Sequence, residues 1–236
     1  MLFSILQGGD ILQAILSLLL MLPIMLLALS LHETAHGWVA WRCGDPTARN
    51  LGRLTLNPLK HLDPVGFLFL LIFGYGWAKP VPINTRYFRK PKRDMALTAA
   101  AGPAANLLLG LFNTVLYGIF WGLYVAQIAL GATGGLVTFL EVLTLTFFYS
   151  AAINFMYMLF NLIPVPPFDG SRIALAFLPD RIYFGIMRYE RQIMFGLLLA
   201  MFILSRFGYS PIGFVATRLP DLIGEPIAKG IFNLLT

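Results

Sequence analysis

The chain has 236 residues, of which 58% are hydrophobic and 12% are charged. This charged share is about half that of soluble globular domains, which excludes an ordinary water-soluble fold. The net charge of +6 could suit nucleic acid, but residues 1–41 and 94–171 contain no Lys or Arg, whereas five crowd into residues 86–93. Basic clusters beside long apolar segments are typical of membrane proteins. We therefore expect a lipid bilayer around the chain and no nucleic-acid partner.

The first predicted element is an apolar segment at residues 11–31, long enough to cross the hydrocarbon core of a bilayer. It lacks the basic start and the cleavage site of a signal peptide, and Pro23 is expected to bend it. Further along, residues 50–57 and 79–84 have the pattern of short extended pieces. Between them, residues 65–77 are apolar but too short to span, which predicts a short re-entrant segment.

Two longer apolar segments follow at residues 96–130 and 136–163, joined by an uncharged turn at 131–135. A shorter candidate span at 193–204 is flanked by arginines, and the tail from residue 211 on is expected to be interfacial. The predicted fold is mainly α: a polytopic transmembrane helical bundle of about four to six spans with a short re-entrant segment and a small β region.

The distribution of basic residues also predicts the topology and the domain organisation. The bias of Lys and Arg toward the cytoplasm places residues 42–93, with the small β region, and residues 164–191 on the cytoplasmic side. Because the sequence shows neither a linker nor a repeat, we expect a single domain over residues 1–236. Within it, the catalytic core covers about 11–172, and a C-terminal span and interfacial tail cover about 185–236. The sequence does not indicate the oligomeric state.

A pair of histidines stands at the end of the first apolar segment, in His32-Glu33-Thr34-Ala35-His36. Helical residues four apart lie on one face, about 6 Å apart along the axis, so both imidazoles can reach one zinc ion. Glu33 can take a proton from zinc-bound water, whose pKa falls toward about 7. The bare pattern also arises by chance, but ionisable groups at membrane depth cost about 2.5–3.5 kcal/mol, which favours a function.

A catalytic zinc site takes three protein ligands and keeps one position open. The chain has three histidines, so the third ligand is either His61 or a carboxylate. Asp169 is the best carboxylate, because it follows a long apolar span in a turn that three prolines and Gly170 would make rigid. An ordinary Asp-Gly surface turn is the alternative interpretation. The lone Cys43 is not expected to bind metal.

Five segments of the chain carry a wider pattern. They are His-Glu-Thr-Ala-His at 32–36, Gly-Arg-Leu-Thr-Leu-Asn-Pro at 52–58, Gly-Trp-Ala-Lys-Pro-Val-Pro at 76–82, Gly-Pro-Ala-Ala-Asn at 102–106, and Asn-Leu-Ile-Pro-Val-Pro-Pro-Phe-Asp-Gly at 161–170. In this order they resemble the site-2 protease family of intramembrane zinc metalloproteases, in the short form without PDZ or CBS domains.

The resemblance implies a set of site residues. His32, His36 and Asp169 would hold one Zn²⁺ per chain, with Glu33 as catalytic base. Asn106 matches a family asparagine that helps to position the substrate or the developing oxyanion, a task that suits a neutral amide donor; an interhelical hydrogen bond is the alternative. His61 matches a family histidine, but its spacing from His36 fits no helix face, so we expect it to order its loop.

The resemblance also implies a function and a place. The chain would be a zinc metalloendopeptidase that hydrolyses a peptide bond in or near the transmembrane segment of membrane-protein substrates, in regulated intramembrane proteolysis. It would be a multi-pass protein of a bacterial-type cell membrane, with its active site near the cytoplasmic side. The extended segments at 50–57 and 79–84 could clamp an unwound substrate as an added strand.

Two other interpretations fit the zinc-binding pair. A membrane protein that transports or scaffolds zinc without cleaving peptides would keep the ligands and have no need for Glu33. A membrane zincin with a glutamate ligand would use Glu141 or Glu190 in place of Asp169. The sequence identifies neither the substrate nor the activating signal.

Overall fold

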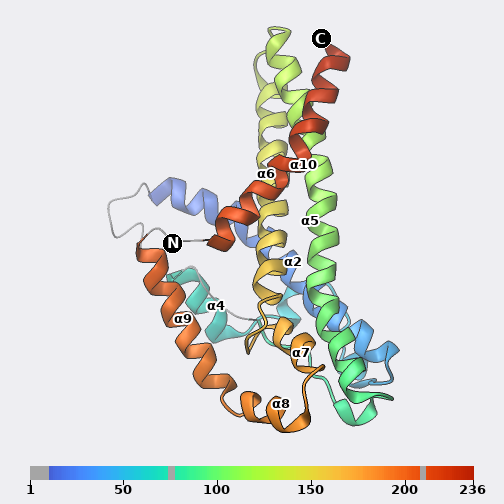
Figure 1. The fold of residues 1–236 in the computed structure, drawn as a ribbon. Coiled ribbons are helices and arrows are strands. Elements are labelled where there is room, and N and C mark those ends of the chain that lie inside the picture. The colour runs from blue at the N-terminus through green and yellow to red at the C-terminus, as the bar shows by residue number, and fades with distance from the viewer. Residues whose placement is uncertain (1–10, 74–77, 208–210) are drawn as a thin grey trace. The chain divides into compact units, whose positions relative to one another are not determined.

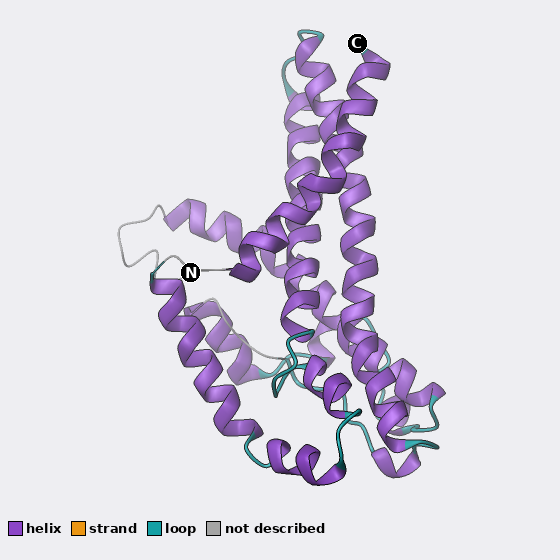
Figure 2. Cartoon of the chain, viewed as in Figure 1, coloured by secondary structure: helices purple, strands orange, loops and turns teal. Residues whose placement is uncertain are grey.

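The computed structural model describes residues 11–73, 78–207 and 211–236, and the described chain is mainly helical (Figures 1 and 2), as predicted. It divides into two compact units, one made of the residues up to Ala105 with Leu162–Glu190, the other of Asn106–Asn161 and Arg191–Thr236. The α-helices are α2 (Ile11–Arg42), α3 (Thr47–Asn50), α4 (Pro64–Phe73), α5 (Pro91–Ala129), α6 (Gly135–Asn161), α7 (Asp169–Leu175), α8 (Asp180–Met187), α9 (Glu190–Arg206) and α10 (Pro211–Leu235).

Three of the described helices are long and apolar enough to cross a membrane: α2 over Leu19–Arg42, α5 and α6. This supports a multi-pass membrane protein, but about four to six spans are not supported within the described residues. The reason lies in the remaining helices. The α4 and α9 helices have only 10 and 17 residues, and α10 carries charged side chains along its length, namely Arg218, Asp221, Glu225 and Lys229.

The predicted small β region is wrong within the described residues. They contain an isolated bridge between Leu62 and Ala78 and no strand, and Figure 2 accordingly draws none. Around residues 50–57 the chain turns at Gly52, where φ is +63°, and then forms local bonds, because the Asn57 side chain accepts the Leu59 N–H. Such side-chain bonds compete with strand ladders.

The second predicted strand, residues 79–84, is extended but cannot form a ladder. Pro80 and Pro82 have no N–H to donate. The N–H groups of Lys79, Val81 and Asn84 are already bonded to His61 O, Glu33 and Asp45. The segment therefore has few N–H groups left that could pair with an added substrate strand.

The apolar stretch predicted as re-entrant begins as the short helix α4. Asp63 caps this helix, because its carboxylate accepts the N–H groups of Val65 and Gly66 at 3.0 and 2.8 Å. Ten residues rise about 15 Å, about half of the hydrocarbon thickness. Residues 74–77, the end of the predicted segment, lie outside the described residues, and a re-entrant course stays a prediction.

In the first unit, the loop after α2 is bonded to the helix beside the histidine pair. The Thr34 hydroxyl donates to the Thr55 carbonyl at 2.7 Å, and the His61 Nε2–H donates to the same carbonyl at 2.8 Å. Gly37 gives this region room, since a Cβ there would come within 2.7 Å of Leu54. The loop is thereby held close to α2.

In the second unit, α10 packs beside α6 and against small residues of α5 (Figure 1). A Cβ on Gly118 would come within 2.8 Å of the Gly224 carbonyl, and one on Gly122 within 2.6 Å of Ile231. Small residues let helix backbones approach closely in a membrane. These glycines therefore form the surface of α5 on which α10 lies.

Candidate metal centre

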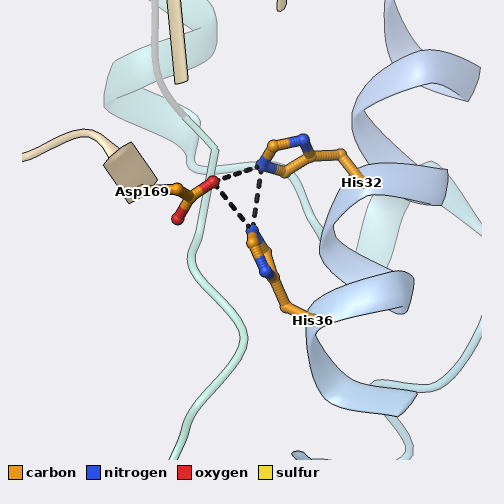
Figure 3. A group of neighbouring side chains, drawn as sticks. All are labelled: His32, His36 and Asp169. Atoms are coloured by element: carbon orange, nitrogen blue, oxygen red, sulfur yellow. Dashed lines mark hydrogen bonds and ion pairs between the residues drawn. The ribbon is translucent and has the colours of Figure 1, made fainter. Parts of the chain in front are cut away.

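Three side chains of the first unit point at one another (Figure 3). The Nε2 atoms of His32 and His36 are 3.0 Å apart, and each is 3.2 Å from Oδ2 of Asp169. Both histidines are buried, at 5% and 7% exposure, and Asp169 is half-buried. They form a group that could hold a metal ion. The structure thus brings together three residues that the sequence singled out.

The size of this triangle fits zinc. In a tetrahedral site with ligands about 2.0–2.2 Å from the ion, neighbouring donor atoms are about 3.3–3.6 Å apart. The observed separations of 3.0, 3.2 and 3.2 Å are slightly shorter than that. Two imidazole nitrogens and one carboxylate oxygen are also a donor set that catalytic zinc uses, with a fourth position left for water or substrate.

The two histidines owe their position to helix α2. Four residues apart, they lie on one face, and their rings meet edge to face with centroids 4.5 Å apart. Asp169 comes from a different segment, as the first residue of α7. The turn before it is held by local bonds, such as that from the Phe168 N–H to the Val165 carbonyl at 3.1 Å.

Gly170 lets this turn come close to its own start. A Cβ there would overlap the carbonyl of Leu162. Any other residue would push the turn apart and displace the neighbouring carboxylate.

Helix α5 orients one of the histidines. Nδ1 of His36 is 2.7 Å from the carbonyl oxygen of Thr98, which can only accept, so Nδ1 carries the proton and donates. The lone pair of Nε2 then faces Asp169 and His32, as a metal ligand requires. Thr98 is fully buried. Sequence reasoning missed this contact, because a backbone carbonyl leaves no signal in residue identity.

Gly102 of α5 leaves the space that the two rings occupy. A Cβ at this position would come within 2.5 Å of His32 Cε1 and of His36 Nε2. The sequence shows Gly102 as part of the Gly-Pro-Ala-Ala-Asn segment at 102–106 and does not indicate that it meets the histidines. The structure shows that any side chain here would displace the donor atom of a histidine.

Glu33 lies next to the first histidine and is held by a separate segment. Its Oε2 accepts the N–H of Val81 at 2.8 Å, and the side chain is 9% exposed. Because Pro80 and Pro82 have no N–H, Val81 is the one donor at these three positions. The Lys-Pro-Val-Pro run therefore aims a single N–H group at the carboxylate.

Three buried polar residues anchor the segment that holds Glu33. At its start, the guanidinium of Arg53 donates to the Lys79 carbonyl at 2.8 Å, and the Lys79 N–H donates to the His61 carbonyl at 2.9 Å. At its end, the carboxylate of Asp45 accepts the Asn84 N–H at 2.6 Å. His61 belongs to this support and not to the group that could hold a metal.

The charge on Asp169 suits a metal ligand. Burial on its own would raise the pKa of the Asp169 carboxyl, but its contacts with His32 and His36 hold that pKa below its usual range. The carboxyl is therefore ionised at neutral pH. A carboxylate ligand must be deprotonated before a metal binds, and Asp169 meets that requirement.

The other sequence-predicted residues lie elsewhere. Asn106 is fully buried in the second unit, where its amide donates to Asn154 Oδ1 at 2.9 Å. Glu141 is exposed on α6, and Glu190 pairs with Arg172 at 3.2 Å. Within the described part of the chain, neither glutamate belongs to a group that could hold a metal.

A group that could hold a metal ion, with its histidines on a helix able to span a membrane and with a glutamate beside the first histidine, is what a membrane metalloprotease requires. Comparison with known proteins names the family. Residues 18–204 match peptidase family M50, the site-2 protease family, and the chain belongs to it. The resemblance read from the five sequence segments is thereby confirmed.

Two relatives support the same conclusion. The chain is 41% identical to the zinc metalloprotease YwhC of Bacillus subtilis over 160 residues, 67% of this chain and 68% of that protein. It is 34% identical to the zinc metalloprotease Rip2 of Mycolicibacterium smegmatis over 151 residues, 61% of this chain and 52% of that one. No solved structure gives a significant match. The chain is a zinc metalloprotease, and zinc is its cofactor.

Proposed function

We propose that this metalloprotease hydrolyses a peptide bond in or near the transmembrane segment of membrane-protein substrates. The observation that carries the proposal is that His32 and His36 lie on a helix apolar and long enough to span a membrane. A protease whose metal ligands lie on such a helix meets its substrate in or beside the bilayer. The multi-pass character of the chain supports the same conclusion.

His32, His36 and Asp169 are the proposed zinc ligands. When bound there, zinc would lower the pKa of a water molecule toward about 7 and polarise the scissile carbonyl. The other steps belong to the chain. Thr98 holds the His36 ring in the tautomer that leaves Nε2 free to ligate, and Gly102 keeps the space around both rings open.

Glu33 is the proposed general base and acid. Its carboxylate takes a proton from the attacking water and passes it to the nitrogen of the scissile bond, so the leaving group departs as a neutral amine and not as an amide anion. Val81 supports this role, because its N–H holds one carboxylate oxygen at 2.8 Å. With Oε2 held, the carboxylate keeps a single orientation during proton transfer.

Asn106 is the proposed substrate-binding residue. It follows Gly102 by four residues, one helical turn further along α5. The amide of Asn154 donates to the Ser150 carbonyl at 2.8 Å, so its Oδ1 faces Asn106 and selects the amide nitrogen of Asn106 as its donor. A side chain held in this way is a preorganised donor or acceptor for a substrate backbone.

The side of the membrane on which the site lies is proposed from the distribution of basic residues. The basic residues between α2 and α5 favour the cytoplasmic side for this end of both helices, in a bacterial-type cell membrane. Cleavage there would release the cytoplasmic part of a substrate, which suits regulated intramembrane proteolysis. The whole of residues 1–236 would act as a single domain.

One experiment tests where cleavage falls. The purified chain is reconstituted in nanodiscs with a single-span test substrate, and in parallel with a soluble peptide that contains the same residues without a membrane anchor. Mass spectrometry of the products should place the cut within or beside the span, and only in the anchored substrate. Equal cleavage of the soluble peptide, or cuts far from the span, would overturn the proposal. Glu33→Gln provides the inactive control.

A further inference from the structure

Five exposed cations gather at one end of the first unit. They are Arg42 at the end of α2, Arg49 on α3, and Arg86, Arg89 and Lys90 just before α5. We call these five residues the basic rim. Neither metal binding nor peptide hydrolysis, as described above, uses any of them.

Two contacts between residues next to these cations bring the two parts of the basic rim together. The carboxylate of Asp45 accepts the Asn84 N–H at 2.6 Å, and a Cβ on Gly44 would come within 2.9 Å of the Tyr87 carbonyl. The loop that follows Arg42 therefore lies against the segment that contains Arg86.

The environment of Cys43 agrees with this placement. Burial raises the pKa of the Cys43 thiol, and so does the charge of Asp94, whereas the charges of Arg93 and Arg89 lower it. These charges act on Cys43 only because the start of α5 and the segment before it lie beside the end of α2.

The acidic residues near the basic rim are buried and bonded to other groups of the protein. Asp45 is fully buried and bonded to Thr47 and Asn84. Asp94 is fully buried and pairs with Arg93 at 2.7 Å, which leaves that pair neutral. Among the described residues, no carboxylate pairs with a member of the basic rim. The surface thus has a strong positive charge that the protein itself does not neutralise.

Aromatic side chains stand among these cations. Arg42 lies over Trp38 at 5.0 Å and over Trp41 at 5.6 Å, and Arg49 lies over Trp41 at 4.6 Å. Trp38 is 48% exposed. Trp and Tyr prefer the level of lipid headgroups, and this group stands where the candidate span of α2 ends and that of α5 begins.

We propose that the basic rim binds the headgroups of anionic phospholipids. The position at the ends of two spanning helices and the interleaved aromatic rings favour a lipid surface over a soluble polyanion. The rim also sets the depth of the metal centre, because His36 precedes Arg42 by six residues, about 9 Å along the helix. Contact with headgroups holds the ligands at that distance from the membrane surface.

The test measures lipid binding directly. The full chain in neutral detergent is titrated with phosphatidylglycerol and with phosphatidylcholine of the same acyl chains, and bound lipids are counted by native mass spectrometry. The wild-type protein should retain phosphatidylglycerol at least about tenfold more tightly at low salt, and the difference should shrink as the ionic strength rises.

Two triple variants make the test specific to the rim. Arg86→Gln/Arg89→Gln/Lys90→Gln should lose most of the preference, since each cation near an anionic lipid surface is worth about fivefold in binding. Arg181→Gln/Arg188→Gln/Arg191→Gln removes three other exposed cations and should keep it. Zinc content verifies the fold of both. An unchanged preference in the first variant, or an equal loss in the second, would overturn the proposal.

A salt titration and a competition complete the experiment. If the first variant lost its zinc, the salt titration of the wild-type protein would decide whether the rim binds the lipid. A preference for phosphatidylglycerol that does not change with salt cannot come from exposed cations and would overturn the proposal. Soluble glycerol phosphate should not displace the bound lipid. Displacement would identify a soluble anion as the ligand and contradict the lipid surface.

Discussion

The two units of this protein use buried polar groups in different ways. In the first, groups from α2, α5, α7 and the loop after α2 converge on one small region, where His36 and Glu33 are each held by a backbone group of another segment. In the second, polar side chains bond in pairs, such as Asn106 with Asn154 and Tyr117 with Asp221. Convergence from many segments makes a reactive centre, whereas pairing between helices mainly fixes their packing.

The largest effect is expected when the first unit loses one of its three proposed zinc ligands. Asp169→Ala should lose stoichiometric zinc and all activity, because two histidines remain where a catalytic site needs three ligands. Metal content by mass spectrometry of the purified protein checks this. Glu225→Gln, which removes an exposed carboxylate paired with Lys229, should keep zinc. Retained zinc in Asp169→Ala would point to Glu141 or Glu190.

Glu33→Gln should separate chemistry from metal binding. The glutamine can still accept the Val81 N–H but cannot take a proton, so zinc content should stay at the wild-type level while kcat falls by about 10²–10⁴. Cleavage of the anchored test substrate measures kcat. Substantial activity in this variant would remove Glu33 from the mechanism.

The asparagine pair of the second unit tests whether that unit also contributes to chemistry. Asn106→Leu and Asn154→Leu each leave a buried amide without its partner, at a cost of about 1–3 kcal/mol in stability. If Asn106 binds substrate, its variant should also lose about 10² in kcat at matched folded fraction. Equal activity losses in both variants would assign Asn106 to packing alone.

Two glycines on α5 allow a matched comparison of the units. Gly102→Ala places a Cβ within 2.5 Å of His36 Nε2, whereas Gly110→Ala places one within 2.8 Å of Phe155 in the second unit. We expect Gly102→Ala to weaken zinc binding by about 10–100-fold. Gly110→Ala should lower stability and leave zinc affinity unchanged. Competition with a zinc chelator measures both, and similar affinities would contradict the assigned role of Gly102.

The smallest effect is expected when Arg53, which anchors the segment that holds Glu33, is replaced. Arg53→Gln removes the bond to the Lys79 carbonyl, so kcat should fall by about tenfold with unchanged zinc. Arg53→Lys, which keeps a charged donor on a longer side chain than glutamine, should recover part of the loss. The exposed Arg49→Gln serves as control. A change in zinc content would show that Arg53 supports the fold as a whole.

What the sequence by itself determined is local. The i, i+4 spacing of His32 and His36 follows from helix periodicity, and long apolar stretches are enough to predict α2, α5 and α6 as spans. Asp169 could be found because prolines and a glycine mark its turn. The predicted small β region failed because a loose alternation does not show that local side-chain bonds and prolines have taken the place of a ladder.

Only the tertiary structure decided how the centre is supported. The carbonyl of Thr98, the N–H of Val81 and the missing Cβ of Gly102 act on residues 48 to 70 positions away. Backbone groups are the same in every residue, so a sequence cannot show which of them will meet a side chain. That information arises only when distant segments pack together.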